Sequence, residues 1–257
     1  MILNPSASAI YLHNIENKQY YDAELDAKKR NEYYCGAVFA PEELHSLLVK
    51  THTTPLRYSP HAYVYPWVDL QENLQLKSLY SGQDLDPVKV MEEDLRLLQS
   101  LEEGGIGIQV IFNTEHVVPQ SWFDGVEPMR GDLHHLFACE PGCNSMRSNY
   151  PYFDFPSYEP EIIAAGIRTG CGMAEEEKFE PEYGKGCVAR AVFYFALRYL
   201  DLINLEDQMD FKLLLGWHNM HPVTVYEQHR NKAIQDLQGN RNPFIDFPDL
   251  AEKMLGM

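Results

Sequence analysis

TEHVVP at residues 114–119 is followed by DLHHL at residues 132–136 and by NSMRSN at residues 144–149. These three polar motifs contain carboxylates, imidazoles, amides and a guanidinium. Such groups can supply a general base, oxygen ligands for a hard divalent cation and a contact for phosphate. Their order and close spacing therefore indicate metal-assisted hydrolysis of phosphodiester bonds.

Glu115 and His116 form the central pair of the first motif. A neutral imidazole can take a proton from water at neutral pH, and a neighbouring carboxylate can bind Mg²⁺. Adjacent residues of a regular strand point to opposite faces, so the strand must end or bulge here if both are to serve one cation. Pro119 favours an end. The alternative is an ordinary Glu-His pair on the surface at the end of a strand.

The other two motifs offer supporting groups, and each group has a simpler alternative. Asp132 and His135 either orient the groups that hold the cation or support a turn. Asn144 is either a neutral oxygen ligand or a helix N-cap. Arg147 either clamps a phosphate through paired hydrogen bonds or pairs with one of the many carboxylates. The compactness of the whole set favours the functional interpretation.

The five cysteines are too few and too scattered for a disulfide scaffold. Cys139 and Cys143 lie near His134 and His135 at a spacing that structural zinc sites permit. Adjacent histidines are awkward ligands for one tetrahedral centre. We therefore expect a disulfide between Cys139 and Cys143, or simple packing, in preference to zinc.

The formal net charge of −17 argues against a broad basic surface for nucleic acid, because contacts with the phosphate backbone rest on Lys and Arg. Bound cations and a local group of arginines would have to carry such contacts. No apolar run approaches the ~20 residues of a membrane span, so we expect no membrane partner. The first residues show no secretion signal, which leaves the localisation open.

The hydrophobic pattern predicts a mixed α+β chain with a single domain. We expect helices at 41–49, 87–101, 144–149, 188–203, 207–220 and 224–238, and strands at 106–112 and 133–137. The last helix starts with a capping box at Thr224 and ends at Gly239. We assign residues 1–40, charged and rich in tyrosine, to an N-terminal surface extension, and residues 41–257 to the domain proper.

Two further motifs follow in the carboxyl-terminal half: KGCVARA at residues 185–191, with Tyr194, and QGNRNPFID at residues 238–246. Together with EHVVPQSWF at residues 115–123, DLHHL and NSMRSN, they resemble the endonuclease I family of ββα-metal nucleases. The resemblance covers about residues 50–250, and the closing motif is highly distinctive. We expect the closing motif to be structural, with Arg241 holding a buried carboxylate or backbone carbonyls.

The resemblance implies an α+β domain built around a ββα-metal core, and it implies roles for single residues. His116 would be the general base, and Glu115 and Asn144 would be the protein ligands of one Mg²⁺, with Mn²⁺ or Ca²⁺ as alternatives. Arg130 would contact phosphate, and Arg190 would be either a packed structural arginine or another phosphate contact. The implied activity is cleavage of DNA, and often RNA, with little sequence specificity, leaving 5′-phosphates.

The expected partner is therefore nucleic acid, bound by a monomer. Many members of the family are secreted or periplasmic, carry a signal peptide and are basic, whereas this chain is acidic and shows no signal. The alternative is a catalytically silent relative that binds nucleic acid or protein. Glu115, His116 and Asn144 are all present, and this argues against a silent relative.

Overall fold

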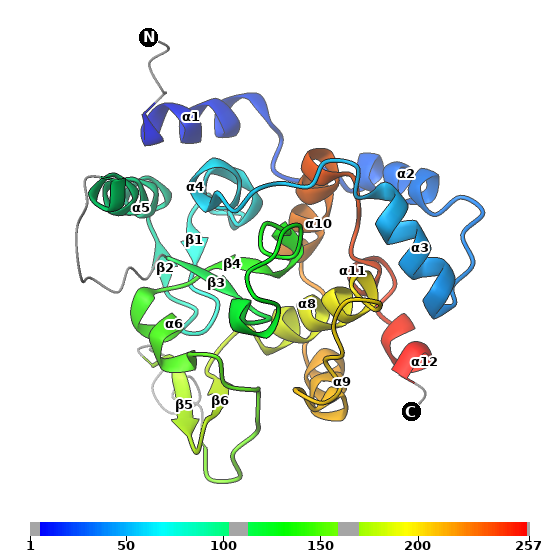
Figure 1. Ribbon diagram of the computed structural model, residues 1–257. Helices are drawn as coiled ribbons and strands as arrows, with labels where there is room; N and C mark the ends of the chain where they lie inside the picture. Colours follow the sequence, from blue (N-terminus) through cyan, green and yellow to red (C-terminus); the bar gives the residue numbers. More distant parts are fainter. Residues whose placement is uncertain (1–5, 103–112, 159–169, 256–257) are drawn as a thin grey trace.

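The computed structural model describes residues 6–102, 113–158 and 170–255. They form helices and three small antiparallel sheets in a single domain (Figure 1). The α-helices are α1 (Ala7–Asn17), α2 (Ala23–Tyr33), α3 (Pro41–Thr51), α4 (Pro60–Tyr63), α5 (Pro87–Glu102), α6 (Pro141–Arg147), α8 (Lys185–Arg198), α9 (Phe211–Met220), α10 (Val225–Gln238), α11 (Pro243–Asp246) and α12 (Leu250–Leu255). The strands are β1 (Leu76–Lys77), β2 (Asp84–Leu85), β3 (Thr114–His116), β4 (Leu136–Ala138), β5 (Gly172–Glu175) and β6 (Lys178–Pro181). Short 3₁₀ or π turns are η1 (Val64–Val68), η2 (Gln120–Trp122) and η3 (Leu133–His135). No helix in these ranges is long and apolar enough to cross a membrane.

The centre of the molecule is α8, which packs against α9, α3, α11 and η3, the turn that leads into β4 (Figure 1). Val192, Phe195 and Tyr199 are fully buried, as expected for one face of a core helix. Phe193 and Tyr194 are buried as well, so α8 is buried nearly all round instead of along one stripe. The helix predicted at 188–203 is present, but it begins at Lys185 and ends at Arg198.

Local signals place several helices where the sequence predicts them. α3 and α5 begin at prolines, which suit the first helical position. α10 begins with the expected capping box, in which the Thr224 hydroxyl accepts from the Glu227 N–H and the Glu227 carboxylate accepts from the Thr224 N–H. It ends at Gly239, whose φ of 98° is the left-handed conformation that favours glycine.

Three boundaries differ from the predictions. α6 begins at Pro141 instead of Asn144, so Asn144 lies inside the helix and is not its N-cap. Residues 133–135 form η3, because the Asp132 carboxylate accepts from the His134 N–H, and this shortens the predicted strand to β4. The N-cap of α9 is Asp210, so that helix starts later than predicted. The predicted strand at 106–112 lies outside the described residues.

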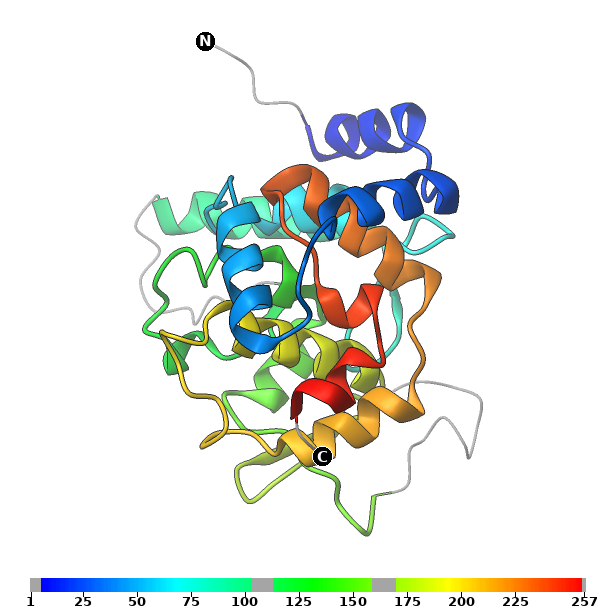
Figure 2. The same ribbon diagram turned by 90° about the vertical axis from the view of Figure 1, so that its right-hand side faces the viewer.

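The amino-terminal segment packs on the rest of the domain. α2 and α3 lie on the same side of the molecule as α10, α11 and α12 (Figure 2). Asp26 of α2 is buried against Arg241, and Tyr34 belongs to the main hydrophobic core. The boundary at residue 40 stays a prediction, but the residues before it contribute to the interior.

Candidate active site

The three sequence motifs meet where β3, β4 and α6 come together. β3 pairs with β4 in antiparallel register, with Glu115 opposite Phe137 and His116 opposite Leu136. α6 follows β4 and packs against β3. The Asn144 side-chain amide donates to the backbone carbonyl of Thr114 at 2.9 Å. This bond ties the middle of the helix to the strand that carries Glu115 and His116.

Glu115 is a buried carboxylate, with only 2% of the residue exposed. Its Oε1 accepts from the Tyr80 hydroxyl at 2.7 Å and lies 3.4 Å from an Nη atom of Arg147. Burial raises the pKa of Glu115 to about 7, although Arg147 and the Tyr80 hydroxyl act in the opposite direction. The Glu115 carboxylate is therefore held in place. Arg147 balances its negative charge only in part, and a divalent cation would balance the rest.

His116 points away from Glu115, as alternation along a strand requires. Its Nε2 lies 3.0 Å from the carbonyl oxygen of Arg130. A carbonyl can only accept, so Nε2 carries the proton and Nδ1 is the basic nitrogen. The ring packs against Tyr58 and His135, with centroids 5.0 and 5.3 Å away. Burial moves the pKa of His116 well below its usual value, which keeps the imidazole neutral.

Asn144 presents an oxygen, because its amide nitrogen is occupied by the Thr114 carbonyl. A carboxylate and an amide oxygen match the preference of Mg²⁺ for a few protein oxygens supplemented by water. Within the described ranges no group of three or more His, Cys, Asp or Glu residues could hold a metal. Glu115 and Asn144 are one carboxylate and one amide, and an amide is not among these four residue types. Their oxygen atoms are ligands of the kind that Mg²⁺ prefers.

The two candidate arginines differ in their surroundings. Arg147 is 1% exposed and donates to the carbonyl of Val117 at 2.7 Å, while its guanidinium lies over the Tyr152 ring. Arg130 is half-buried, donates to Gln120 at 2.9 Å and covers the Tyr58 ring. Arg130 is therefore partly exposed beside His116, whereas Arg147 faces the interior and Glu115.

Asp132 lies in a buried network behind the site. Its Oδ2 accepts from the hydroxyls of Tyr194 and Tyr199 at 2.7 and 2.9 Å, and its Oδ1 accepts from Gln238 at 2.8 Å. Burial alone would raise the pKa of Asp132, but the neighbouring histidines and the Tyr194 hydroxyl hold it below its usual range. Asp132 thus joins the DLHHL motif to α8 and to the closing motif.

His135 also belongs to the interior. It donates from Nε2 to the carbonyl of Met129 at 2.7 Å and packs on the Phe195 ring. Burial lowers its pKa to about 4, so the ring is neutral at ordinary pH. Its contact with His116 is therefore a packing contact between neutral rings, and it supports the imidazole of the candidate base.

Arg190 takes part in a separate buried ion pair. Its guanidinium binds both carboxylate oxygens of Glu227, at 2.6 and 2.9 Å, and also donates to the carbonyl of His221 at 2.9 Å. It joins α8 to the start of α10. These contacts match the first of the two roles expected for Arg190, that of a packed structural arginine.

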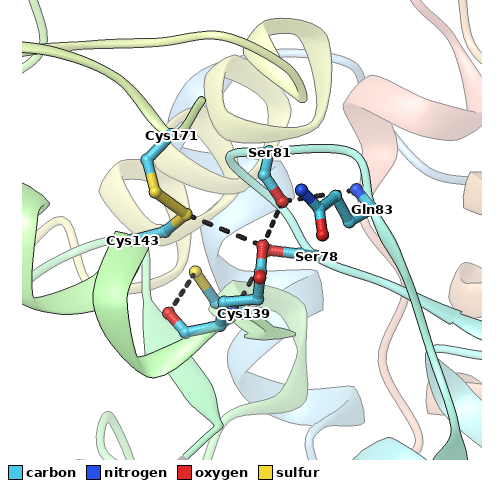
Figure 3. The surroundings of a disulfide bond; sticks show 7 residues. Ser78, Ser81, Gln83, Cys139, Cys143 and Cys171 are labelled. Atoms are coloured by element: carbon cyan, nitrogen blue, oxygen red, sulfur yellow. Dashed lines mark hydrogen bonds between the residues drawn. A yellow bond between two sulfur atoms is a disulfide. The ribbon is translucent and has the colours of Figure 1, made fainter. Parts of the chain in front are cut away.

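The disulfide joins Cys143 to Cys171, with Cα atoms 5.0 Å apart (Figure 3). The expected Cys139–Cys143 pairing is therefore wrong. Cys139 is a free, buried thiol at the end of β4, whereas Cys143 lies in α6, which packs against the start of β5. Because Cys143 is consumed, the alternative of a zinc site with Cys139 and Cys143 is excluded as well. The bond links the helix that carries Asn144 to the β5–β6 hairpin.

Reducing this disulfide should lower the free energy of unfolding by about 3–4 kcal/mol, because the bond restricts the unfolded chain across a sequence separation of 28 residues. Urea unfolding of the oxidised and reduced protein measures the difference. Cys35→Ser, at an exposed free thiol, is the control and should leave stability unchanged. Equal stability of the oxidised and reduced forms would contradict the prediction.

The chain belongs to the endonuclease I family, whose family model matches residues 42–249. It is 33% identical over 160 residues to an extracellular ribonuclease of Bacillus amyloliquefaciens, a match covering 56% of this chain and 53% of the relative. It is 32% identical over 173 residues to an extracellular ribonuclease of Bacillus subtilis (strain 168), covering 61% and 57%. It is 30% identical over 152 residues to a periplasmic deoxyribonuclease of Aeromonas hydrophila, covering 51% and 62%. The chain thus spans a little over half of the length of these relatives.

Proposed function

We propose that this protein is a Mg²⁺-dependent endonuclease that hydrolyses phosphodiester bonds in DNA and RNA with little sequence specificity. The observation that carries the proposal is the arrangement around β3, in which Glu115 and His116 are neighbours in the strand and Asn144 of α6 is tied to it by a hydrogen bond to the Thr114 carbonyl. The order of antiparallel β3 and β4 followed by α6 supports a ββα-metal core.

Glu115 and Asn144 would hold the cation through oxygen atoms. The chemistry that a bound Mg²⁺ supplies is Lewis-acid stabilisation of the charge that develops on the phosphate and on the leaving oxygen. Arg147 and Tyr80 fix the carboxylate of Glu115 from behind. The Thr114 carbonyl fixes the amide of Asn144. These contacts orient both ligands before the substrate binds.

His116 would act as the general base, taking a proton from water on Nδ1. The Arg130 carbonyl holds the opposite nitrogen, which keeps the imidazole in the required tautomer. The guanidinium of Arg130 lies over the Tyr58 ring, which packs against His116, and it would contact the phosphate that is cleaved. Attack of this water on phosphorus breaks the bond to the 3′-oxygen, which takes a proton from solvent water, so the products carry a 5′-phosphate and a 3′-hydroxyl.

The relatives and the disulfide support a proposal for the substrates and the compartment. The similar proteins are named for deoxyribonuclease and for ribonuclease activity, so we propose that both nucleic acids are substrates. Their names place them outside the cell or in the periplasm, and disulfides persist in such oxidising compartments. We propose that the protein acts outside the cell or in the periplasm. We also propose that it acts as a monomer.

The metal requirement is tested by incubating supercoiled plasmid or structured RNA with the protein and Mg²⁺, with and without EDTA. We expect nicking and linearisation with Mg²⁺, no cleavage with EDTA, and recovery when excess Mg²⁺ or Mn²⁺ is added back. Glu115→Gln should cleave poorly at low Mg²⁺ and recover in part at high Mg²⁺, because it keeps the shape of the ligand but loses the charge. Undiminished cleavage in EDTA would rule out the proposed mechanism.

A further inference from the structure

Tyr80 lies outside every motif that the sequence analysis identifies, yet its hydroxyl reaches the centre of the candidate site. The residue lies in the turn that connects β1 to β2 and is fully buried, and its hydroxyl donates to Glu115 Oε1 at 2.7 Å. The backbone around it is anchored on two sides. The N–H of Leu79 donates to the carbonyl of Ala138 in β4, and the N–H of Tyr183 donates to the Tyr80 carbonyl. The position of the hydroxyl is therefore fixed by the fold.

Tyr80 is part of a closed ring of contacts around Glu115. Its hydroxyl lies 2.8 Å from that of Tyr152, which donates to the carbonyl of Val117 at 3.2 Å. Arg147 donates to the same carbonyl at 2.7 Å and lies 3.4 Å from Glu115 Oε1. Tyr80 and Arg147 thus restrain the Glu115 carboxylate directly. Tyr152 and the Val117 carbonyl hold Tyr80 and Arg147 in place.

The chemistry of the ring favours a role in holding the carboxylate at one angle. A carboxylate that binds a metal is usually itself hydrogen-bonded, and loss of such an outer contact typically weakens metal affinity or activity by 10–100-fold. Tyr80 is a neutral donor, so it can fix Oε1 without repelling a cation. A second arginine in its place would orient the carboxylate equally well but would compete with the metal for its charge.

We propose that Tyr80 is a positioning residue that orients Glu115 for the divalent cation. The inference rests on the proposed function, because it requires Glu115 to be a ligand. With Oε1 held by Tyr80, the other carboxylate oxygen of Glu115 and the amide oxygen of Asn144 would hold the cation.

The test is the dissociation constant of Mn²⁺, measured by electron paramagnetic resonance on Tyr80→Phe and the unaltered protein. We expect the constant to rise by about 10–100-fold when the hydroxyl is removed. Cleavage of plasmid by Tyr80→Phe should fall at low Mg²⁺ and recover at high Mg²⁺, with KM for the plasmid unchanged. A purely structural role for Tyr80 would not produce this dependence on metal concentration.

Tyr34→Phe is the matched control. The Tyr34 hydroxyl also donates to a buried carboxylate, that of Asp246, at 2.9 Å, and neither residue contacts Glu115 or Asn144. We expect both this variant and Tyr80→Phe to lose thermal stability, but Tyr34→Phe should bind Mn²⁺ with unaltered affinity.

Two results would overturn the inference, and they have different meanings. If Tyr80→Phe binds Mn²⁺ normally while Glu115→Gln does not, Tyr80 has no positioning role and the proposed function stands. If Glu115→Gln binds Mn²⁺ normally, the ligand assignment fails and the role of Tyr80 fails with it.

Discussion

Replacing His116 by alanine should lower the rate of plasmid cleavage by about 10²–10⁴-fold, the usual contribution of a general base. The fold and the affinity for Mn²⁺ should be unchanged, because the His116 ring points away from Glu115 and, within the described part of the chain, its side chain donates a hydrogen bond only to the Arg130 carbonyl. Single-turnover cleavage at saturating Mg²⁺ measures the effect on the chemical step. Full activity of His116→Ala would refute the assignment of the base.

A control for this variant is His45→Ala on α3, a histidine that bonds to the Leu197 carbonyl, away from the three motifs. It should cleave at the normal rate. The pH profile gives a second check on His116. Burial lowers the pKa of His116, and only the neutral ring accepts a proton. At saturating Mg²⁺ the rate of the unaltered protein should therefore stay high at neutral pH and fall only well below pH 6.5, the ordinary pKa of histidine.

Replacing Arg241 by alanine should be the most destabilising single change in the closing motif. The guanidinium is 0% exposed and binds Asp26 at 2.9 Å and Asp246 at 2.6 and 2.8 Å. Its loss would leave two buried carboxylates without their cation, and breaking such a buried pair costs about 3–5 kcal/mol. Thermal unfolding should show Tm lower by roughly 10 °C for a domain of this size.

A compensating variant separates the lost charge from the lost side chain. Combining Arg241→Met with Asp26→Asn and Asp246→Asn removes all three charges and should recover part of the stability. Should Arg241→Ala keep its Tm and lose only cleavage, Arg241 would belong to the active site instead of the frame.

The parts of the fold that sequence predicts well are those decided by neighbours along the chain. The capping box at Thr224 and Glu227 and the left-handed turn at Gly239 each depend on atoms a few residues apart. The same is true of the prolines that begin α3 and α5. The three polar motifs could also be assigned to one site, since they lie close together in sequence and the strands that carry them pair.

Contacts between distant residues could not be predicted in this way. No spacing rule joins Cys143 to Cys171, and the expected local pairing with Cys139 is wrong. Nothing in the residues around Tyr80 indicates that it reaches Glu115, 35 positions away. The burial of Arg147 is equally unexpected, because a guanidinium near a candidate metal site is as easily read as a phosphate contact.

The partnership between Asp26 and Arg241 has a consequence for biosynthesis, because the two residues are 215 positions apart. At ordinary translation rates of about 5–20 residues per second, α2 leaves the ribosome roughly 10–40 s before its guanidinium partner is made. During that interval Asp26 of the nascent helix lacks the Arg241 guanidinium with which it is buried in the folded protein. We therefore expect α2 to stay undocked on the emerging chain, and a polypeptide that stalls before residue 241 to present this helix to chaperones and proteases.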